Sequence, residues 1–195
     1  MLSHPILPNG TLGTSNQPHL LIDDWLTLRP WRSGDAATVR TAFDDPDIQR
    51  WHVRRMDGDD EARAWTADWP GRWAAETDAS WAIADRDDQP VGQVGLRTIE
   101  LSSASAQLSY WVLPTARGTG IAVRAVVALT RWCFYEVGLN RLFLMHSTAN
   151  QASCRVAERA VFALEGTLRE SMLHADGLHD AHVHARLRPR RKLES

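Results

Sequence analysis

Two glycines and an arginine at a predicted strand-to-helix turn could bind a phosphate group. The turn is Pro114 to Ala122, with the sequence Pro-Thr-Ala-Arg-Gly-Thr-Gly-Ile-Ala. Gly118 and Gly120 have no Cβ, so the chain can turn tightly there and expose successive backbone N–H groups. The helix that follows adds unpaired N–H donors and the positive end of its dipole. The turn therefore favours an anion, although the same glycines would also suit a plain helix cap.

Two common nucleotide-binding loops do not fit this turn. A P-loop ends in Gly-Lys-Ser/Thr, whereas Gly120 is followed by Ile121 and Ala122. A dinucleotide-binding loop needs a third Gly or Ala and an acidic residue about 20 positions further on. Val123 stands at the third position, and residues 138–141 are Gly-Leu-Asn-Arg. Nucleoside triphosphates and dinucleotides are therefore disfavoured as ligands.

The elements that must position this turn are a strand before it and a helix after it. Alternating apolar residues predict the strand over 106–113, and apolar residues at three- and four-residue spacing predict the helix from about 122 to 137. The same criteria predict further strands over 26–31, 80–85, 91–99, 141–147, 167–173 and 181–187. They predict further helices over 37–43, from 59 onward with a break at Pro70, and over 150–163. This order predicts the α/β (α+β) class, with one mixed, mostly antiparallel sheet and helices on both faces.

Composition limits the kind of protein. The chain has 195 residues and a formal net charge of -2, so one domain is expected and no basic field points to nucleic acid. No apolar run reaches the roughly 20 residues of a membrane span. Cys133 and Cys154 fall in separate predicted helices, which argues against a disulfide framework and for a cytoplasmic protein. We expect an N-terminal arm over residues 1–20, which is either mobile or docked, a domain over 21–188 and a basic tail over 189–195.

Several spaced motifs together resemble the GCN5-related N-acetyltransferases (GNATs), in the branch of the ribosomal-protein N-terminal acetyltransferases of the Rim type. The motifs are Leu28-Arg29-Pro30, Tyr110 to Ala122, Asn150-x-x-Ser153 and the hairpin from Asp176 to His184. The resemblance implies the GNAT fold over about residues 24–188 and acetyl-CoA, or another acyl-CoA, as cosubstrate. It also implies an enzyme that transfers the acyl group directly to a primary amine.

The resemblance assigns site residues. It places the diphosphate on the turn and pantetheine beside the preceding strand, with Asn150 and Ser153 on the next helix. The implied cofactor-binding residues are Val112, Leu113, Arg117, Gly118, Thr119, Gly120, Ile121, Ala122, Asn150 and Ser153. Asn150 could equally be a helix N-cap. Ser153 could protonate the leaving thiolate or be a solvated serine. Neither cysteine is expected to be a nucleophile.

The general base is less clear from the sequence. A position that is usually Glu in this branch is Gln107, and the Gly that usually precedes Phe162 is Val161. The candidates for the base are Glu100, which ends a strand beside the expected cleft, and His52, since histidine has the more suitable unperturbed pKa. A water chain from Gln107 is a third alternative. The acceptor-pocket candidates are Trp51, Trp73, Trp81, Gln107 and Tyr110, although tryptophans at helical spacing also suit a core.

The histidines near the C-terminus raise the question of a metal. His182 and His184 share one face of a predicted strand, but no Cys or acid at suitable spacing joins them, so no metal site is predicted.

The acceptor, which is the expected partner, is an amine of a protein N-terminus or of a small molecule. The alternatives are an aminoglycoside or metabolite N-acetyltransferase, a succinyltransferase, and a non-catalytic acyl-CoA-binding module, which Gln107 keeps open. No nucleic-acid or membrane partner is expected. A homodimer through the helix after the turn, or through the final hairpin, stays open.

Overall fold

One sheet of eight strands organises the chain, in the order β1-β2-β3-β4-β5-β6-β8-β7. The structure is a computed structural model that describes residues 4–52 and 54–189. The strands are β1 Leu20–Asp23, β2 Leu26–Pro30, β3 Ala79–Ala84, β4 Pro90–Glu100, β5 Ser105–Val112, β6 Arg141–Ser147, β7 Ala163–His174 and β8 Gly177–Leu187. β5 and β6 pair in parallel, and the other neighbouring strands pair antiparallel. The predicted mixed, mostly antiparallel sheet is confirmed.

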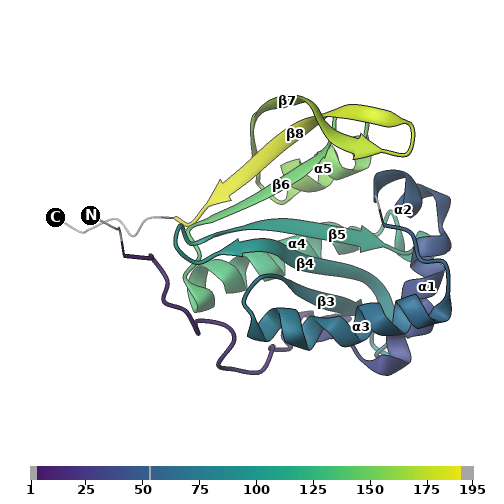
Figure 1. The fold of residues 1–195 in the computed structure, drawn as a ribbon, viewed down its shortest axis with the longest axis horizontal. Helices are drawn as coiled ribbons and strands as arrows, with labels where there is room; N and C mark the ends of the chain where they lie inside the picture. Colours follow the sequence, from purple (N-terminus) through teal and green to yellow (C-terminus); the bar gives the residue numbers. More distant parts are fainter. Residues whose placement is uncertain (1–3, 53, 190–195) are drawn as a thin grey trace.

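Helices cover both faces of this sheet, as predicted (Figure 1). They are α1 Ala36–Asp44, α2 Pro46–Trp51, α3 Asp59–Ala74, α4 Ile121–Trp132, continued by the π-helical turn Cys133–Val137, and α5 Gln151–Arg159. α4 and α5 pack on one face, and α1 to α3 pack on the other. No helix within the described ranges is long and apolar enough to cross a membrane.

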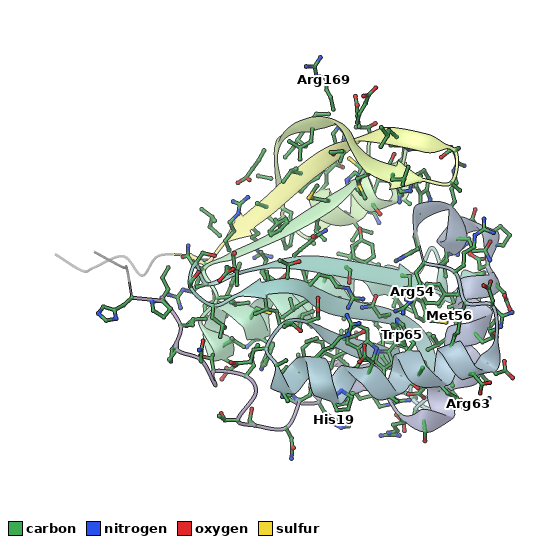
Figure 2. All side chains as sticks on the ribbon, viewed as in Figure 1. His19, Arg54, Met56, Arg63, Trp65 and Arg169 are labelled. Carbon is green, nitrogen blue, oxygen red and sulfur yellow. The ribbon has the colours of Figure 1, made fainter. Side chains whose placement is uncertain are left out.

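Two apolar clusters hold the helices to the sheet. α4 buries Ile121, Ala125, Val126 and Leu129, which follow the helical repeat, against the even-numbered residues of β5. On the other face, α3 places Trp65 against the sheet, as Figure 2 shows. Arg169 on β7 points away from the molecule in the same view.

Three local predictions need correction. The break expected at Pro70 is absent, and α3 continues through it because tryptophans on both sides of the proline are buried in the core. The helix expected over 150–163 ends at Arg159, since Val161 adopts φ +61° and turns the chain back. This left-handed backbone explains why a glycine would suit position 161. The strand β1 was not predicted, because its four residues carry no clear alternation.

The N-terminal segment from residue 4 to 19 lies against the domain. Leu12 is 2% exposed, and the backbone N–H groups of Gly10, Leu12 and Gly13 donate to the carboxylate of Glu76, at 2.6, 2.5 and 3.1 Å. The indole N–H groups of Trp73 and Trp81 donate to carbonyls of the same segment. Glu76 therefore acts as the main polar anchor of the segment. Most of the tail expected over 189–195 lies outside the described residues.

Glu76→Gln is expected to release this segment. Burial disfavours the charged carboxylate, but the three donated hydrogen bonds outweigh it and hold the pKa of Glu76 below its ordinary value. The stabilisation is therefore present above the unfolded-state pKa and is lost as the pH falls through the lower folded-state pKa. We expect Glu76→Gln to lower the free energy of unfolding by about 1–3 kcal/mol. Amide hydrogen exchange of residues 6–16 should increase at pH 7.

Acidification should release the segment in the wild type and have little further effect in Glu76→Gln. Glu170→Gln is the matched control, because Glu170 is exposed on β7. Unchanged protection of residues 6–16 in Glu76→Gln would contradict this role.

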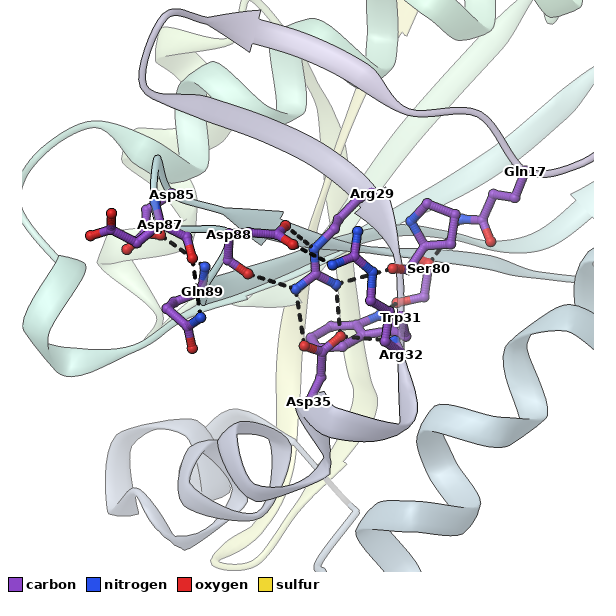
Figure 3. A network of polar contacts seen from close by, with 11 residues as sticks. Gln17, Arg29, Trp31, Arg32, Asp35, Ser80, Asp85, Asp87, Asp88 and Gln89 are labelled. Atoms are coloured by element: carbon purple, nitrogen blue, oxygen red, sulfur yellow. Dashed lines mark hydrogen bonds and ion pairs between the residues drawn. The ribbon is translucent and has the colours of Figure 1, made fainter.

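A buried ion network ties β2 to the start of α1 (Figure 3). The Arg29 guanidinium donates to both carboxylate oxygens of Asp35, at 2.7 and 3.0 Å, and its Nε donates to Asp88 at 2.6 Å. Arg29 is 2% exposed and Asp35 is 6% exposed, whereas the carboxylate of Asp88 reaches solvent. Arg29 of the Leu-Arg-Pro motif is thus a structural cation. Its hydrogen bond to Asp88 also connects β2 to the β3–β4 turn.

Candidate functional site

The cleft arises where two parallel strands separate. β5 and β6 pair from Ser105 and Arg141 to Leu108 and Leu144, and beyond these residues β5 pairs only with β4. Figure 1 shows the two strands diverging from this point. Their separation leaves a cleft of about 730 Å³, lined by residues of α2, β5, α4, β6, α5 and β7. Side chains far apart in the sequence therefore face one space.

The exposed edge of β5 offers backbone hydrogen-bonding groups to this cleft. The N–H of Leu113 donates to the carbonyl of Val91, on the β4 side. Because backbone groups alternate in direction along a strand, the N–H groups of Tyr110 and Val112 point to the opposite side, into the cleft. Leu113 itself is absent from the cleft lining and packs against the cluster under α1 to α3. The expectation that Leu113 faces the ligand is therefore corrected in favour of Val112.

The glycine turn closes one end of the cleft. Gly118 and Gly120 both adopt φ +77°, and a Cβ at either position would meet no atom within 4 Å. Gly120 is the N-cap of α4, so the first amides of that helix face the same space. Arg117, Ile121 and Ala122 also line the cleft. The backbone thus forms an open cradle of N–H donors that fits an anionic group.

Two side chains of the turn make hydrogen bonds to other residues of the protein. The hydroxyl of Thr119 donates to the carbonyl of Ala116 at 2.8 Å, and Thr119 does not line the cleft. The guanidinium of Arg117 donates to Asp45 and Asp47 at the start of α2. Burial disfavours the Asp45 carboxylate, but Arg117 and the N–H of Ile48 outweigh it and lower its pKa. Arg117 therefore holds the turn against α2, while the turn binds through its backbone.

Two cations of the cleft were not predicted from the sequence. Arg155 and Arg159 of α5 are exposed and line the cleft. Together with Ala152 and Val156 they follow the i, i+3, i+4, i+7 spacing of one helix face. That periodicity could have identified them once the helix was known to face the turn. They supply positive charge to the cleft that the glycine turn closes.

Asn150 and Ser153 lie together at the start of α5. The side-chain oxygen of Asn150 accepts from the N–H of Ser153 at 3.0 Å, so Asn150 is an N-cap. Within residues 4–52 and 54–189, no hydrogen bond uses its amide nitrogen, which remains able to donate into the cleft. The hydroxyl of Tyr110 donates to the carbonyl of Ser153 at 3.4 Å, and burial raises the pKa of Tyr110 to about 12. The hydroxyl of Tyr110 is therefore protonated at pH 7 and lies against the backbone of Ser153.

The opposite wall is aromatic. The ring of Trp51 in α2 lies 5.6 Å from that of His174 and 6.4 Å from that of His179, so α2 contacts the β7–β8 hairpin. Trp51, His52, His174 and Gln107 all line the cleft. Burial, with smaller effects of Arg97 and His174, lowers the pKa of His52 to about 4. His52 is therefore neutral at pH 7 and a weaker proton acceptor than an ordinary histidine.

A second possible proton acceptor lies on the β6 side. The hydroxyl of Ser147, which lines the cleft, is 2.7 Å from Nδ1 of His179, and Nε2 of His179 is 2.9 Å from the carboxylate of Asp176. Because the carboxylate accepts the Nε2 proton, Nδ1 is left to accept from the serine. The sequence predicts Asp176 and His179 in a hairpin turn and indicates no catalytic role for them.

Comparison with known families now decides the fold family. The family model described as an acetyltransferase (GNAT) domain matches residues 26–163, which include β5, the glycine turn and α5. The chain belongs to the GNAT acetyltransferase family. It is an N-acetyltransferase, as the sequence predicted.

Relatives of this GNAT chain include an uncharacterized N-acetyltransferase, YoaA, of Bacillus subtilis (strain 168). It is 24% identical over 173 residues, which span 88% of this chain and 98% of YoaA. The ribosomal-protein-serine acetyltransferase of Escherichia coli (strain K12) is 28% identical over 102 residues, which span 52% of this chain and 57% of that protein. The solved structure of RimL, a ribosomal L7/L12 alpha-N-protein acetyltransferase, in complex with coenzyme A superposes with a TM-score of 0.79. Its identity is 20%, and the match covers 87% of this chain and 98% of that one.

Three more predicted site residues of this GNAT domain, besides Leu113 and Thr119, lie away from the cleft. Trp81 is fully buried and packs against Trp73 and Trp132, with ring centroids 5.9 and 5.5 Å away, so the acceptor-pocket assignment of Trp73 and Trp81 is corrected to core packing. Glu100 is exposed and pairs with Ser105, at the end of β5 opposite the glycine turn, and its carboxylate accepts from Ser102. Its assignment as the base is corrected for this reason.

Proposed function

We propose that this GNAT domain transfers an acetyl group from acetyl-CoA to the N-terminal amine of a protein. The observation that carries the proposal is the separation of β5 and β6 beside the glycine turn. The turn offers N–H donors to a diphosphate, and the free edge of β5 offers N–H groups to an extended pantetheine arm. Arg155 and Arg159 add positive charge to the wall of the same cleft. The ribosomal-protein acetyltransferases among the relatives support a protein acceptor.

The reaction requires three groups around the thioester. A backbone N–H of Tyr110 or Val112 would donate to the thioester oxygen as negative charge develops there. The amine would attack the carbonyl carbon, forming the C–N bond as the C–S bond breaks. The leaving thiolate would take a proton from the hydroxyl of Ser153 or of Tyr110, both of which line the cleft. Direct transfer then needs no covalent enzyme intermediate.

The amine's proton needs an acceptor, and we assign it to the chain from Ser147 through His179 to Asp176. His52 is the weaker candidate because burial lowers its pKa to about 4. His179→Gln should reduce kcat at least about tenfold, whereas His52→Gln should reduce it less. The pH dependence of kcat/KM, measured for both variants with one peptide acceptor, checks this order. A larger loss of kcat in His52→Gln than in His179→Gln would assign the role of proton acceptor to His52.

One assay tests the function. Free CoA would be measured with acetyl-CoA or succinyl-CoA and an amine panel, which contains peptides with free N-termini, the same peptides N-acetylated, and small metabolite amines. We expect CoA release with acetyl-CoA and free-amine peptides alone. Release with small amines instead favours a metabolite enzyme, and release with succinyl-CoA favours a succinyltransferase. Acyl-CoA binding without release under any condition favours a non-catalytic module, which Gln107 would fit.

Gly120→Ala should weaken acetyl-CoA binding. A Cβ has room at this position, but φ +77° strains any residue other than glycine by about 1–2 kcal/mol. Relief of that strain would turn the first amides of α4 away from the diphosphate. We expect the KM for acetyl-CoA to rise about tenfold, with a smaller change in kcat.

Gly138→Ala is the matched control, since Gly138 adopts φ +89° outside the cleft. It should lower stability by a similar amount and leave the KM unchanged. An equal rise in KM for both variants would contradict binding by the turn.

A further inference from the structure

Three imidazoles and one thiol converge next to the cleft, on the side of α5 that faces the sheet. They are His146 of β6, Cys154 of α5, and His182 and His184 of β8. One possible ligand atom from each lies within 4.8 Å of the others. His146 and His182 are directly opposed across the β6–β8 pairing, and His184 follows two residues later on the same face of β8. Three different elements therefore bring their donors to one point.

The hydrogen bonds of two histidines fix which ring nitrogen faces that point. Nδ1 of His146 is 2.8 Å from the carbonyl of Ser147, and Nδ1 of His184 is 3.3 Å from the carbonyl of Phe162. A carbonyl can only accept, so both Nδ1 atoms carry the proton and both Nε2 atoms present a lone pair. This arrangement, with a backbone carbonyl behind the ring, is the one that metal-binding histidines commonly use.

Three buried ring nitrogens of these histidines make no hydrogen bond in the described part of the chain. Nε2 of His146, Nδ1 of His182 and Nε2 of His184 are all buried, and none has a hydrogen-bond partner within residues 4–52 and 54–189. Buried polar atoms are rarely left unpaired, because the loss of water costs about 1–3 kcal/mol for each. Three such nitrogens gathered at one place point to a ligand that accepts all three lone pairs.

We propose that His146, Cys154, His182 and His184 bind one Zn²⁺ ion. Three imidazole nitrogens and one thiolate form a set that Zn²⁺ binds in tetrahedral geometry, whereas Mg²⁺ and Ca²⁺ require oxygen ligands. Zinc bond lengths place tetrahedral ligand atoms about 3.3–3.6 Å apart. Small side-chain rotations would close the present separations to this value. On binding, the Cys154 thiol loses its proton to solvent and its sulfur bonds to the metal.

All four ligands come from the protein, so the ion would be structural. It would tie α5 to β6 and β8 at Cys154, next to Ser153 and one turn after Asn150 on the cleft wall. Spacing along the final hairpin alone predicts no metal. His146 and Cys154 precede His182 by 36 and 28 residues, and only the β6–β8 pairing and the packing of α5 bring them together.

The test uses protein without a polyhistidine tag, purified with and without a chelator step. We expect one zinc per chain by elemental analysis, and an affinity of tens of nanomolar or tighter in competition with a chromophoric chelator, roughly the lower limit for structural zinc. Replacement by Co²⁺ should give tetrahedral ligand-field bands and a thiolate-to-cobalt charge-transfer band. Zinc should also raise the Tm of the metal-free protein.

Two variants and one control decide the ligands. Cys154→Ala should abolish the charge-transfer band and weaken zinc binding by at least about tenfold. Cys133→Ala, which changes the other cysteine, in the core beneath α4, should keep both. His182→Gln is the second ligand variant, because His182 is only partly buried and its loss should leave the fold intact. Substoichiometric zinc without the cobalt band, or binding that survives both ligand variants, would overturn the proposal.

Discussion

Asp35→Ala is expected to lower the free energy of unfolding by about 3–5 kcal/mol, the cost of leaving one partner of a buried ion pair alone. The guanidinium of Arg29 is 2% exposed and donates two hydrogen bonds to this carboxylate. Asp88, the other carboxylate that pairs with Arg29, is partly exposed to solvent and accepts a hydrogen bond from the Nε of Arg29. Because Asp35 also accepts from the N–H of Arg32 at 2.8 Å, the variant loses the polar closure of the turn into α1 as well. A Tm decrease of roughly 10 °C should follow for a chain of this size.

Asp88→Ala provides the matched comparison, since it removes the exposed partner and leaves the two bonds between Arg29 and Asp35. We expect it to cost less than half as much as Asp35→Ala, because exposed ion pairs contribute about 1 kcal/mol or less. The double variant Arg29→Met/Asp35→Ala should recover part of the stability, since no charge is then buried alone. Chemical denaturation of the four proteins gives these differences directly. A loss under 1 kcal/mol for Asp35→Ala would show that the pair is dispensable.

The order of strands and helices could be predicted because each long element has a clear apolar period. α4 and β5 were predicted within about one residue at the glycine turn, where the switch from alternation to helical spacing is sharp. The errors came where tertiary packing overrode a local rule. Pro70 does not end α3 because the tryptophans around it are anchored in the core. Val161 turns the chain in a conformation that sequence alone assigns to glycine.

The residues of the candidate site could likewise be predicted only in part. The glycine turn is contiguous, so its residues could be found by their spacing alone. Leu113 and Val112 are neighbours, and only the strand pairing decides which of them faces the cleft. Trp81 and Trp51 have the same chemistry, and only the sheet places the first in the core and the second on the cleft wall. Residue types therefore indicate candidates, while long-range pairing selects among them.

Ser153→Ala tests the group that protonates the leaving thiolate. Loss of a positioned general acid lowers kcat by about 100-fold or more, equivalent to about 2.7 kcal/mol of transition-state stabilisation. The KM for acetyl-CoA should change little, because the substitution leaves the diphosphate cradle and the amide of Asn150 unchanged. The backbone N–H of Ser153 keeps its bond to Asn150 in this variant, so the N-cap and the helix should remain. Steady-state kinetics at saturating acceptor measure the expected split.

Three further variants identify the hydroxyl that acts. Ser153→Thr keeps a hydroxyl at the position and should retain most of kcat, whereas a merely structural role would be disturbed more by the larger side chain. Tyr110→Phe removes the neighbouring hydroxyl, and a 100-fold loss there, with Ser153→Ala within twofold of wild type, would transfer the role to the tyrosine. Glu100→Gln, outside the cleft, should be fully active. If Ser153→Ala and Tyr110→Phe both retain wild-type kcat, protonation comes from solvent and breakdown to the thiolate does not limit the rate.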